Sequence, residues 1–159
     1  MQIHLYDSPA QVGQAAAMLL AAKIIEKPDA VLGLATGSTP IPTYQALIQM
    51  YKSGVLDFSK VRSFNLDEYC KLPVEHECSY HSFMRQQLFD HVNIRPGNTH
   101  VPDGNAKNAQ EECANYDMAI SRAGGIDAQV LGIGRNGHIG FNEPGEAFVY
   151  GCHIVNLTH

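Results

Sequence analysis

The stretch best suited to chemistry is residues 131–145, which read Leu-Gly-Ile-Gly-Arg-Asn-Gly-His-Ile-Gly-Phe-Asn-Glu-Pro-Gly. It places an imidazole, His138, five positions before a carboxylate, Glu143, among five glycines. Glycines let a backbone approach a ligand closely, and a neutral imidazole moves protons near pH 7. A loop histidine bonded only to backbone is the plain alternative. The surrounding glycines and Asn142-Glu143-Pro144 favour an active-site loop instead.

A second polar segment, Thr36-Gly37-Ser38-Thr39, lies between an apolar run and a helical pattern. Backbone N–H groups at a helix N-terminus attract anions, and the hydroxyls of Thr36, Ser38 and Thr39 can donate to phosphate oxygens. The lysine of a P-loop is absent. An ordinary strand-to-helix turn with a Ser or Thr cap explains this segment equally well when it is taken alone. Two further polar loops on the same sheet edge favour phosphate binding.

A pair of carboxylates, Asp67-Glu68, lies just past a second predicted strand, residues 61–65. A partly desolvated carboxylate at a strand end can remove a proton from a carbon next to a carbonyl. An isolated Asp-Glu pair is more often a solvated turn in which one of the two caps a helix. We expect Asp67 to be the pocket residue, although strand alternation alone does not decide between them.

A metal site is a weaker interpretation of another cluster. Its spacing matches no usual zinc pattern, and a predicted helix cap at Ser79 separates the candidates. No metal is therefore expected. The candidate ligands are Cys70, His76, Cys78 and His81.

Helices and strands alternate along the chain. Ser8 followed by Pro9 marks a helix start, and apolar spacing marks the other helices. Helices are predicted over residues 8–27, 43–52, 79–91 and 105–123, and strands over 30–35, 61–65, 128–133 and 153–157.

This alternation predicts an α/β fold, a doubly wound, mostly parallel sheet with helices on both faces. Ligands of such sheets bind at the carboxyl ends of the strands. The loops 36–40, 66–70 and 134–145 each follow a strand, so we expect them to meet at one edge. The 159 residues provide for one domain, 1–159. The chain ends after a strand-like segment without a closing helix, which is expected of a C-terminally truncated domain.

Composition narrows the class of protein. A hydrophobic content of 45% suits a globular chain, and a net charge of -5 without a basic cluster argues against nucleic acid. The apolar stretch 15–25 is too short to span a membrane, and no secretory signal is apparent. The cysteines lack a CxxC pair and are expected to be free thiols in the cytoplasm.

Taken together, the three loops resemble glucosamine-6-phosphate deaminase, of the glucosamine/galactosamine-6-phosphate isomerase family. The likeness runs in order and spacing from the first helix to the end of the chain. The matching segments are Leu34-Ala35-Thr36-Gly37-Ser38-Thr39-Pro40, Phe64-Asn65-Leu66-Asp67-Glu68-Tyr69, Gly132 to Pro144, Ser79-Tyr80-His81-Ser82-Phe83-Met84 and Gly104-Asn105-Ala106.

The resemblance implies conversion of glucosamine 6-phosphate and water to fructose 6-phosphate and ammonia in amino-sugar catabolism. It implies that His138, supported by Glu143, opens the sugar ring and that Asp67 moves the proton from C2 to C1. The loop Thr36 to Thr39 would hold the 6-phosphate. No metal or organic cofactor is expected, because this proton transfer needs only an acid, a base and positioning.

Two departures from the family pattern affect these expectations. Asn136 stands where many members carry Asp, so it can orient His138 by hydrogen bonding but cannot stabilise its cation as a carboxylate would. Family members also continue well past His159, into a part that supplies Arg and Lys to the phosphate site. We therefore expect the 159-residue chain alone to fold poorly or be inactive. Residues 146–153 contain no Arg or Lys, which argues against activation by N-acetylglucosamine 6-phosphate.

Two other functions remain open. A 6-phosphogluconolactonase would share the architecture and phosphate loop but would need no C2 base. A sugar-phosphate-sensing domain would keep the anion loop and could lose its acid and base. Asp67, His138 and Glu143 favour catalysis over both. The substrate is expected to be a small molecule, and a homo-oligomer and a monomer are both compatible with the sequence.

Overall fold

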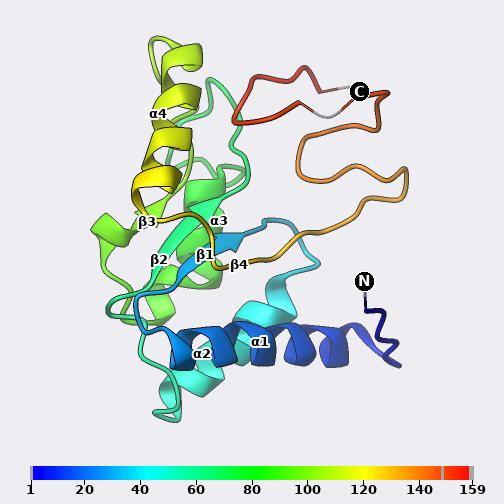
Figure 1. The fold of residues 1–159 in the computed structure, drawn as a ribbon, viewed down its shortest axis with the longest axis vertical. Coiled ribbons are helices and arrows are strands. Elements are labelled where there is room, and N and C mark those ends of the chain that lie inside the picture. Colours follow the sequence, from blue (N-terminus) through cyan, green and yellow to red (C-terminus); the bar gives the residue numbers. More distant parts are fainter. Residues whose placement is uncertain (1, 148, 158–159) are drawn as a thin grey trace.

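The computed structural model describes residues 2–147 and 149–157, so positions 1 and 159 of the predicted domain lie outside it. Its centre is a four-stranded sheet in the order β3-β2-β1-β4 (Figure 1). Every described ladder is parallel, and in the longest, Val31 pairs with Arg62 and Leu34 with Asn65. The strands are β1 Val31–Leu34, β2 Arg62–Asn65, β3 Thr99–His100 and β4 Ala128–Gln129.

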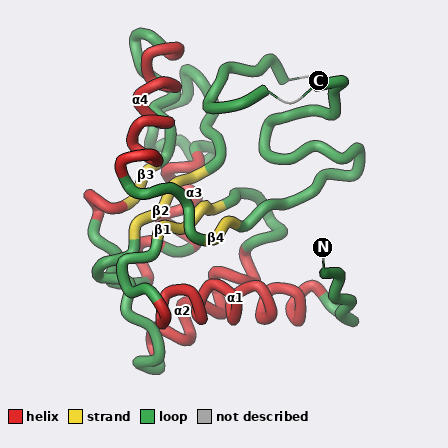
Figure 2. The backbone as a smooth tube through the Cα atoms, in the orientation of Figure 1, coloured by secondary structure: helices red, strands yellow, loops and turns green. Residues whose placement is uncertain are grey.

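Helices lie on both faces of this sheet (Figure 2), as the sequence predicts. One face is covered by α1 Pro9–Glu26, α2 Ile41–Lys52 and α3 Tyr80–Gln87. The other is covered by α4 Ala109–Arg122, whose Tyr116 packs on Val31 and Phe64. The doubly wound α/β prediction is therefore confirmed.

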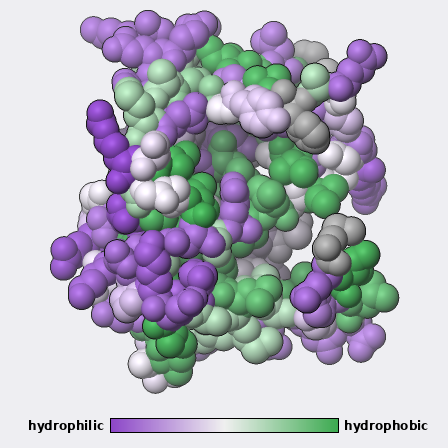
Figure 3. Space-filling model, viewed as in Figure 1, coloured by the Kyte–Doolittle hydropathy of each residue, from purple (hydrophilic) through white to green (hydrophobic). Residues whose placement is uncertain are grey.

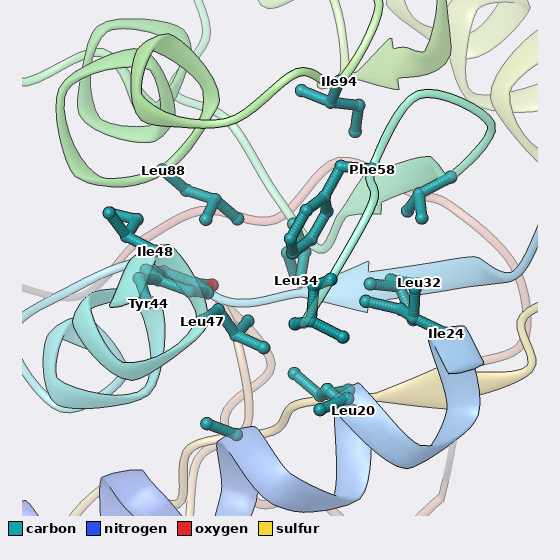
Figure 4. Close-up of a cluster of buried hydrophobic side chains, with 14 of the residues drawn as sticks. Leu20, Ile24, Leu32, Leu34, Tyr44, Leu47, Ile48, Phe58, Leu88 and Ile94 are labelled. Atoms are coloured by element: carbon teal, nitrogen blue, oxygen red, sulfur yellow. The ribbon is translucent and has the colours of Figure 1, made fainter. Parts of the chain in front are cut away.

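The larger core lies between β1 and the first three helices. Leu32 and Leu34 point from β1 toward α1 and α2, while Val31 faces α4, as strand alternation requires (Figure 4). The side chains that meet there come from all these elements and include Leu20, Ile24, Tyr44, Leu47, Ile48, Phe58, Leu88 and Ile94. This packed core fixes the carboxyl end of β1.

Several element bounds differ from the prediction. α4 begins at Ala109 instead of residue 105, because Asn105 is held in a turn by hydrogen bonds to Asp103 (2.9 Å) and to the Leu72 carbonyl (2.7 Å). α2 begins two residues earlier than predicted. α3 ends at Gln87, after which the buried Leu88 leaves helical geometry and a 3₁₀ turn spans Phe89–His91.

Two strand predictions need correction. β4 has only two residues, because β1, its partner, ends at Leu34 and residues 130–133 leave the sheet. The predicted strand 153–157 is wrong, since no strand is found there. That segment is attached to α4 instead, through the Cys152 N–H, which lies 3.0 Å from both carboxylate oxygens of Asp117. β3 and the 3₁₀ turn Pro96–Asn98 before it were not predicted.

The surface alternates between apolar and polar patches. Figure 3, viewed as in Figure 1, shows apolar residues around a hollow in the middle of the molecule, with hydrophilic side chains surrounding them. α1 is apolar on its outer side as well, where Val12, Met18, Leu19 and Ile25 are exposed. Within residues 2–147 and 149–157, no helix has the length and apolar character needed to cross a membrane.

Candidate active site

A cavity of about 500 Å³ opens at the carboxyl ends of β1, β2 and β4. The three polar loops meet there, as expected of a parallel sheet. Its wall includes Thr36 and Thr39 from the first loop, Asp67 from the second, and His138 and Glu143 from the third. Gly37, Ser38 and Asn136 belong to the same loops but do not line the cavity.

The Thr36–Thr39 turn has unused hydrogen-bond donors. Gly37 has a φ of +95°, and no side chain caps the start of α2, so the capping interpretation of this turn is wrong. In the first turn of α2, the Ile41 amide donates to the Ser38 carbonyl at 3.4 Å and the Tyr44 amide to the Pro40 carbonyl at 3.1 Å. The amides of residues 37–39 have no partner among the described residues. These loop amides and hydroxyls can therefore bind an anion.

Asp67 follows β2 directly and faces the cavity. Burial raises the pKa of its carboxyl to about 6, and the neighbouring charge of Glu68 contributes in the same direction. A hydrogen bond from the Phe141 amide partly opposes the rise in pKa. At pH 7 such a group is about nine-tenths ionised and is a stronger base than an ordinary aspartate.

Glu68 has a different partner set, which separates the roles of the two carboxylates. It accepts hydrogen bonds from the Ser79 hydroxyl (2.9 Å) and from the Tyr80 (3.0 Å) and His81 (3.1 Å) amides at the start of α3. It is thus the helix-capping member of the pair, and Asp67 is the one that lines the cavity. Asp67 was the expected pocket residue, but the cap formed by Glu68 was not expected, because it joins residues eleven or more positions apart.

His138 is oriented by a short hydrogen-bonded chain. Asn136 Oδ1 lies 2.8 Å from His138 Nδ1 and accepts the His138 amide at 3.1 Å. Asn136 Nδ2 donates to Glu143 Oε2 at 2.5 Å. Because an amide oxygen can only accept, Nδ1 carries the proton and Nε2 keeps a free lone pair. Asn136, although outside the cavity wall, therefore sets the tautomer that a base at Nε2 needs.

Two glycines allow this arrangement. The His138 ring lies over Gly134, where an added Cβ would come within 2.2 Å of a ring carbon. Gly140, with a φ of +59°, lies against Asp67, whose Oδ2 would be 3.0 Å from an added Cβ. Close contact, and not flexibility alone, thus explains glycine at these positions in the loop.

An aromatic cluster joins the three loops, and nothing in the sequence periodicity indicated it. Tyr69, Tyr80 and Phe141 have ring centroids 4.9–5.7 Å apart. Burial raises the pKa of Tyr80, a hydrogen bond with Tyr69 adds to the rise, and one with Thr36 opposes it. Tyr80 therefore connects α3 to the Thr36–Thr39 turn as well as to Phe141.

A second cavity, of about 580 Å³, lies on the other side of Asp67, beneath α4. Its wall includes the half-buried Cys113 and Cys152, which like Cys70 and Cys78 are free thiols. Within the described ranges, no set of three or more His, Cys, Asp or Glu side chains is placed to hold a metal ion. The residues shared by both cavity walls are Leu66, Asp67, Gly140, Phe141 and Leu157.

Comparison with known proteins agrees with this geometry. The family model described as glucosamine-6-phosphate isomerases/6-phosphogluconolactonase matches residues 7–141. That match covers most of the chain. The chain belongs to this family. The resemblance first noted in the three loops is thereby confirmed.

Curated relatives of the family are similar along nearly the whole chain. A glucosamine-6-phosphate deaminase of Halothermothrix orenii is 53% identical over 99% of this chain and 66% of its own length. One of Clostridioides difficile is 56% identical over 90% of this chain and 57% of its own length. The chain thus spans somewhat less than two thirds of the curated relatives it matches.

Two solved structures differ in how similar they are to this chain. A monomeric glucosamine-6-phosphate deaminase superposes with a TM-score of 0.96 at 43% identity, covering 99% of this chain and 66% of that one. A 6-phosphogluconolactonase of Thermotoga maritima gives a TM-score of 0.72 at 25% identity, covering 87% and 62%. The chain is therefore more similar to the deaminase than to this lactonase.

Proposed function

We propose that the protein converts glucosamine 6-phosphate and water to fructose 6-phosphate and ammonia in amino-sugar metabolism. The observation that carries the proposal is one cavity wall that holds an ionisable base, Asp67, an oriented imidazole, His138, and an anion-binding turn. The relatives of highest identity cited above bear the deaminase name, which supports the same reaction. Residues 1–159 would form a single sugar-phosphate domain.

The substrate is placed by its phosphate. The loop amides and hydroxyls of Thr36, Gly37, Ser38 and Thr39 donate to the 6-phosphate. No Lys or Arg lines the cavity among residues 2–147 and 149–157. Phosphate binding by this part of the protein therefore depends on neutral donors, which form weaker contacts than charge-assisted ones.

His138 opens the sugar ring. Its free Nε2 lone pair takes the proton of the C1 hydroxyl and returns a proton to the ring oxygen as the C1–O bond breaks. The Asn136–Glu143 chain keeps Nδ1 protonated throughout. It also places a carboxylate where it can offset the transient imidazolium charge, through the intervening amide.

Asp67 transfers the proton in the open-chain sugar. It removes the proton from C2, forming an enolamine, and the proton is delivered to C1. The resulting C2 imine takes up water and releases ammonia, leaving fructose 6-phosphate. A raised pKa near 6 suits a group that must first accept and then return a proton near neutral pH.

Product analysis tests the proposal directly. Protein expressed from the complete gene is purified and incubated with glucosamine 6-phosphate, and ammonia and fructose 6-phosphate are measured in parallel. Equal molar release of both is expected. N-acetylglucosamine 6-phosphate, which has no free amine, is the matched negative control. Hydrolysis of 6-phosphogluconolactone without ammonia release from the amino sugar would instead establish the lactonase alternative. Binding of sugar phosphates without turnover would establish a sensing domain.

The cellular setting and assembly are further proposals. A net charge of -5 makes nucleic acid an unsuitable partner, and the four free thiols suit a cytoplasmic enzyme that needs no cofactor and no membrane. A homo-oligomer stays a prediction from the sequence. Light scattering of the purified protein gives the mass in solution and decides between a monomer and an oligomer.

A further inference from the structure

Glu68 is held more completely than any other carboxylate around the cavity. Its Oε1 accepts the Tyr69 (2.8 Å) and Tyr80 (3.1 Å) amides. Its Oε2 accepts the Ser79 hydroxyl (2.9 Å) and the Tyr80 (3.0 Å) and His81 (3.1 Å) amides. Both oxygens are thus saturated by four donors, three of which begin α3.

The Glu68 carboxylate places a negative charge at the N-terminus of α3. The first turn of α3 has no acidic residue of its own, and its cap, Ser79, is fully buried. A negative charge at this end compensates the positive end of the helix dipole and the unpaired amides. Glu68 supplies that charge from a loop eleven residues upstream, so the contact joins β2 to α3.

The contact between Glu68 and α3 lies next to two residues of the proposed active site, one in the Asp67 loop and one on α3. Asp67 precedes Glu68 in the chain, and Tyr80 follows the cap on α3. Tyr80 packs on Phe141, with centroids 5.7 Å apart, and hydrogen-bonds Thr36. Phe141 in turn donates its amide to Asp67. Glu68 thus holds the Asp67 loop against α3, and Tyr80 of α3 contacts the other two loops of the cavity.

We propose that Glu68 is a positioning residue, which clamps the Asp67 loop to the start of α3 and so fixes the Asp67 carboxylate against the substrate. The inference rests on the proposed deaminase function, in which Asp67 is the C2 base. Glu68 itself does not contact substrate, because its oxygens are occupied by α3 and Tyr69.

The charge of Glu68 adds a second effect on Asp67. Glu68 raises the pKa of Asp67. The other ionisable side chains around the two cavities that Asp67 lines include Tyr80, Tyr116, His138, Glu143, Glu112 and Asp117. No Lys or Arg in the described ranges lines either cavity to oppose this effect. Removing the Glu68 charge must therefore lower the pKa of Asp67.

Glu68→Gln tests the inference, because it keeps the shape of the side chain and removes its charge. Glu77→Gln is the matched control, since Glu77 is an exposed carboxylate in the same loop. In Glu68→Gln we expect kcat to fall on the order of ten- to a hundredfold, as for a slightly misplaced base, with little change in KM. The acidic limb of the pH profile should also move to lower pH. Glu77→Gln should match the wild type in both respects.

A measurement independent of turnover accompanies the kinetics. Carbon-13 NMR follows the titration of the Asp67 carboxyl, with Asp67→Asn to assign its signal. The midpoint is expected to be lower in Glu68→Gln than in the wild type and Glu77→Gln. An unchanged midpoint together with an unchanged pH profile would overturn the inference. A wild type that releases no ammonia would overturn the proposed function, and the NMR result would show separately whether Glu68 acts on Asp67.

Glu68→Asp covers the case in which the Gln variant does not fold. This change keeps the charge and shortens the side chain by one methylene, so the clamp is strained while the electrostatic effect remains. A reduced kcat with the Asp67 midpoint retained would support the positioning role. An unchanged kcat would contradict it.

Discussion

The two walls of the cavity are built in opposite ways. The Asp67 wall continues a buried strand, with the Leu66 amide bonded to the Leu34 carbonyl at 3.2 Å and Glu68 bonded to α3. The His138 wall is a loop whose side chains are largely exposed. The hydrogen bonds around His138, such as Gly134 N–H to the His138 carbonyl at 2.8 Å, stay within the loop, and the Phe141 amide bonds Asp67 across the cavity.

This difference indicates how each group is prepared for chemistry. Asp67 is fixed and desolvated by the fold itself, which raises its pKa and costs stability when it ionises. His138 is oriented by a local chain of hydrogen bonds through Asn136 that involves no core residue. Changes in the Asp67 wall should therefore affect stability and activity together, while changes in the His138 wall should affect activity alone.

The largest effect is expected from removing the imidazole. His138→Asn eliminates the ring-opening acid and base, and general acid–base groups contribute about 10²–10⁴-fold to rate. Its unfolding temperature should stay within about 1 °C of the wild type, because the loop is exposed. Steady-state kinetics and thermal unfolding measure the two quantities. A large loss of stability would show that the loop is integrated into the core after all.

A matched pair of glycine variants tests the local packing of the His138 wall. In Gly134→Ala the new Cβ would meet the His138 ring at 2.2 Å, whereas in Gly132→Ala it would meet nothing within 4 Å. We expect about a hundredfold lower kcat/KM for the first, as for a misplaced catalytic group, and a near-normal value for the second. Equal activities in the two variants would contradict the ring position.

Removing the amide that orients His138 should have a smaller effect. Asn136→Ala frees Nδ1 and leaves Glu143 without its partner, so the imidazole samples the wrong tautomer. We expect kcat to fall about tenfold or more, with the protein equally stable. Asn136→Asp, which places a carboxylate beside the imidazole, should move the pH profile of activity upward, because a carboxylate stabilises the imidazolium cation. An unchanged kcat in Asn136→Ala would exclude the tautomer role.

The smallest effect concerns the stability of the Asp67 wall. The folded-state pKa of Asp67 is raised from 3.8 to about 6, so the folded protein binds more protons than the unfolded chain between these values. Stability is therefore lost as the pH rises through this window. Asp67→Asn should raise the unfolding temperature by about a few degrees at pH 7 and leave it unchanged near pH 3.

Asp57 provides the opposite sign as a control. A hydrogen bond from the Ser59 amide, and others from Asn93 and the Ser59 hydroxyl, hold the pKa of its carboxyl below the usual value. Asp57→Asn should therefore lower the unfolding temperature at pH 7. If Asp67→Asn lowered the unfolding temperature at pH 7, as Asp57→Asn is expected to do, the account of Asp67 as a desolvated carboxylate would be wrong.

Much of the fold followed from local pattern. The strands β1 and β2, and the start of α1 at Ser8 and Pro9, were predicted because each depends on a short-range signal. The prediction of a strand over residues 153–157 was wrong, because apolar composition does not show whether a neighbouring strand is present to pair with it. β3, with two residues, is too short to show a periodicity.

The site shows the same division. The three loops were predicted together, because parallel strands bring their carboxyl ends to one edge. Asp67 was the expected pocket residue, but the capping of α3 by Glu68 was not predicted, since it depends on α3 lying beside the loop. The aromatic cluster of Tyr69, Tyr80 and Phe141 likewise forms only when three distant segments meet.

The central claim is that Asp67 is the base that removes the C2 proton. Proton NMR of glucosamine 6-phosphate in deuterium oxide measures exchange at C2 directly, and a separate titration measures binding of the sugar phosphate. The wild type should exchange the C2 proton, and Asp67→Asn should bind the sugar phosphate with C2 exchange at the background rate. Exchange that persists at the wild-type rate in Asp67→Asn would contradict the account.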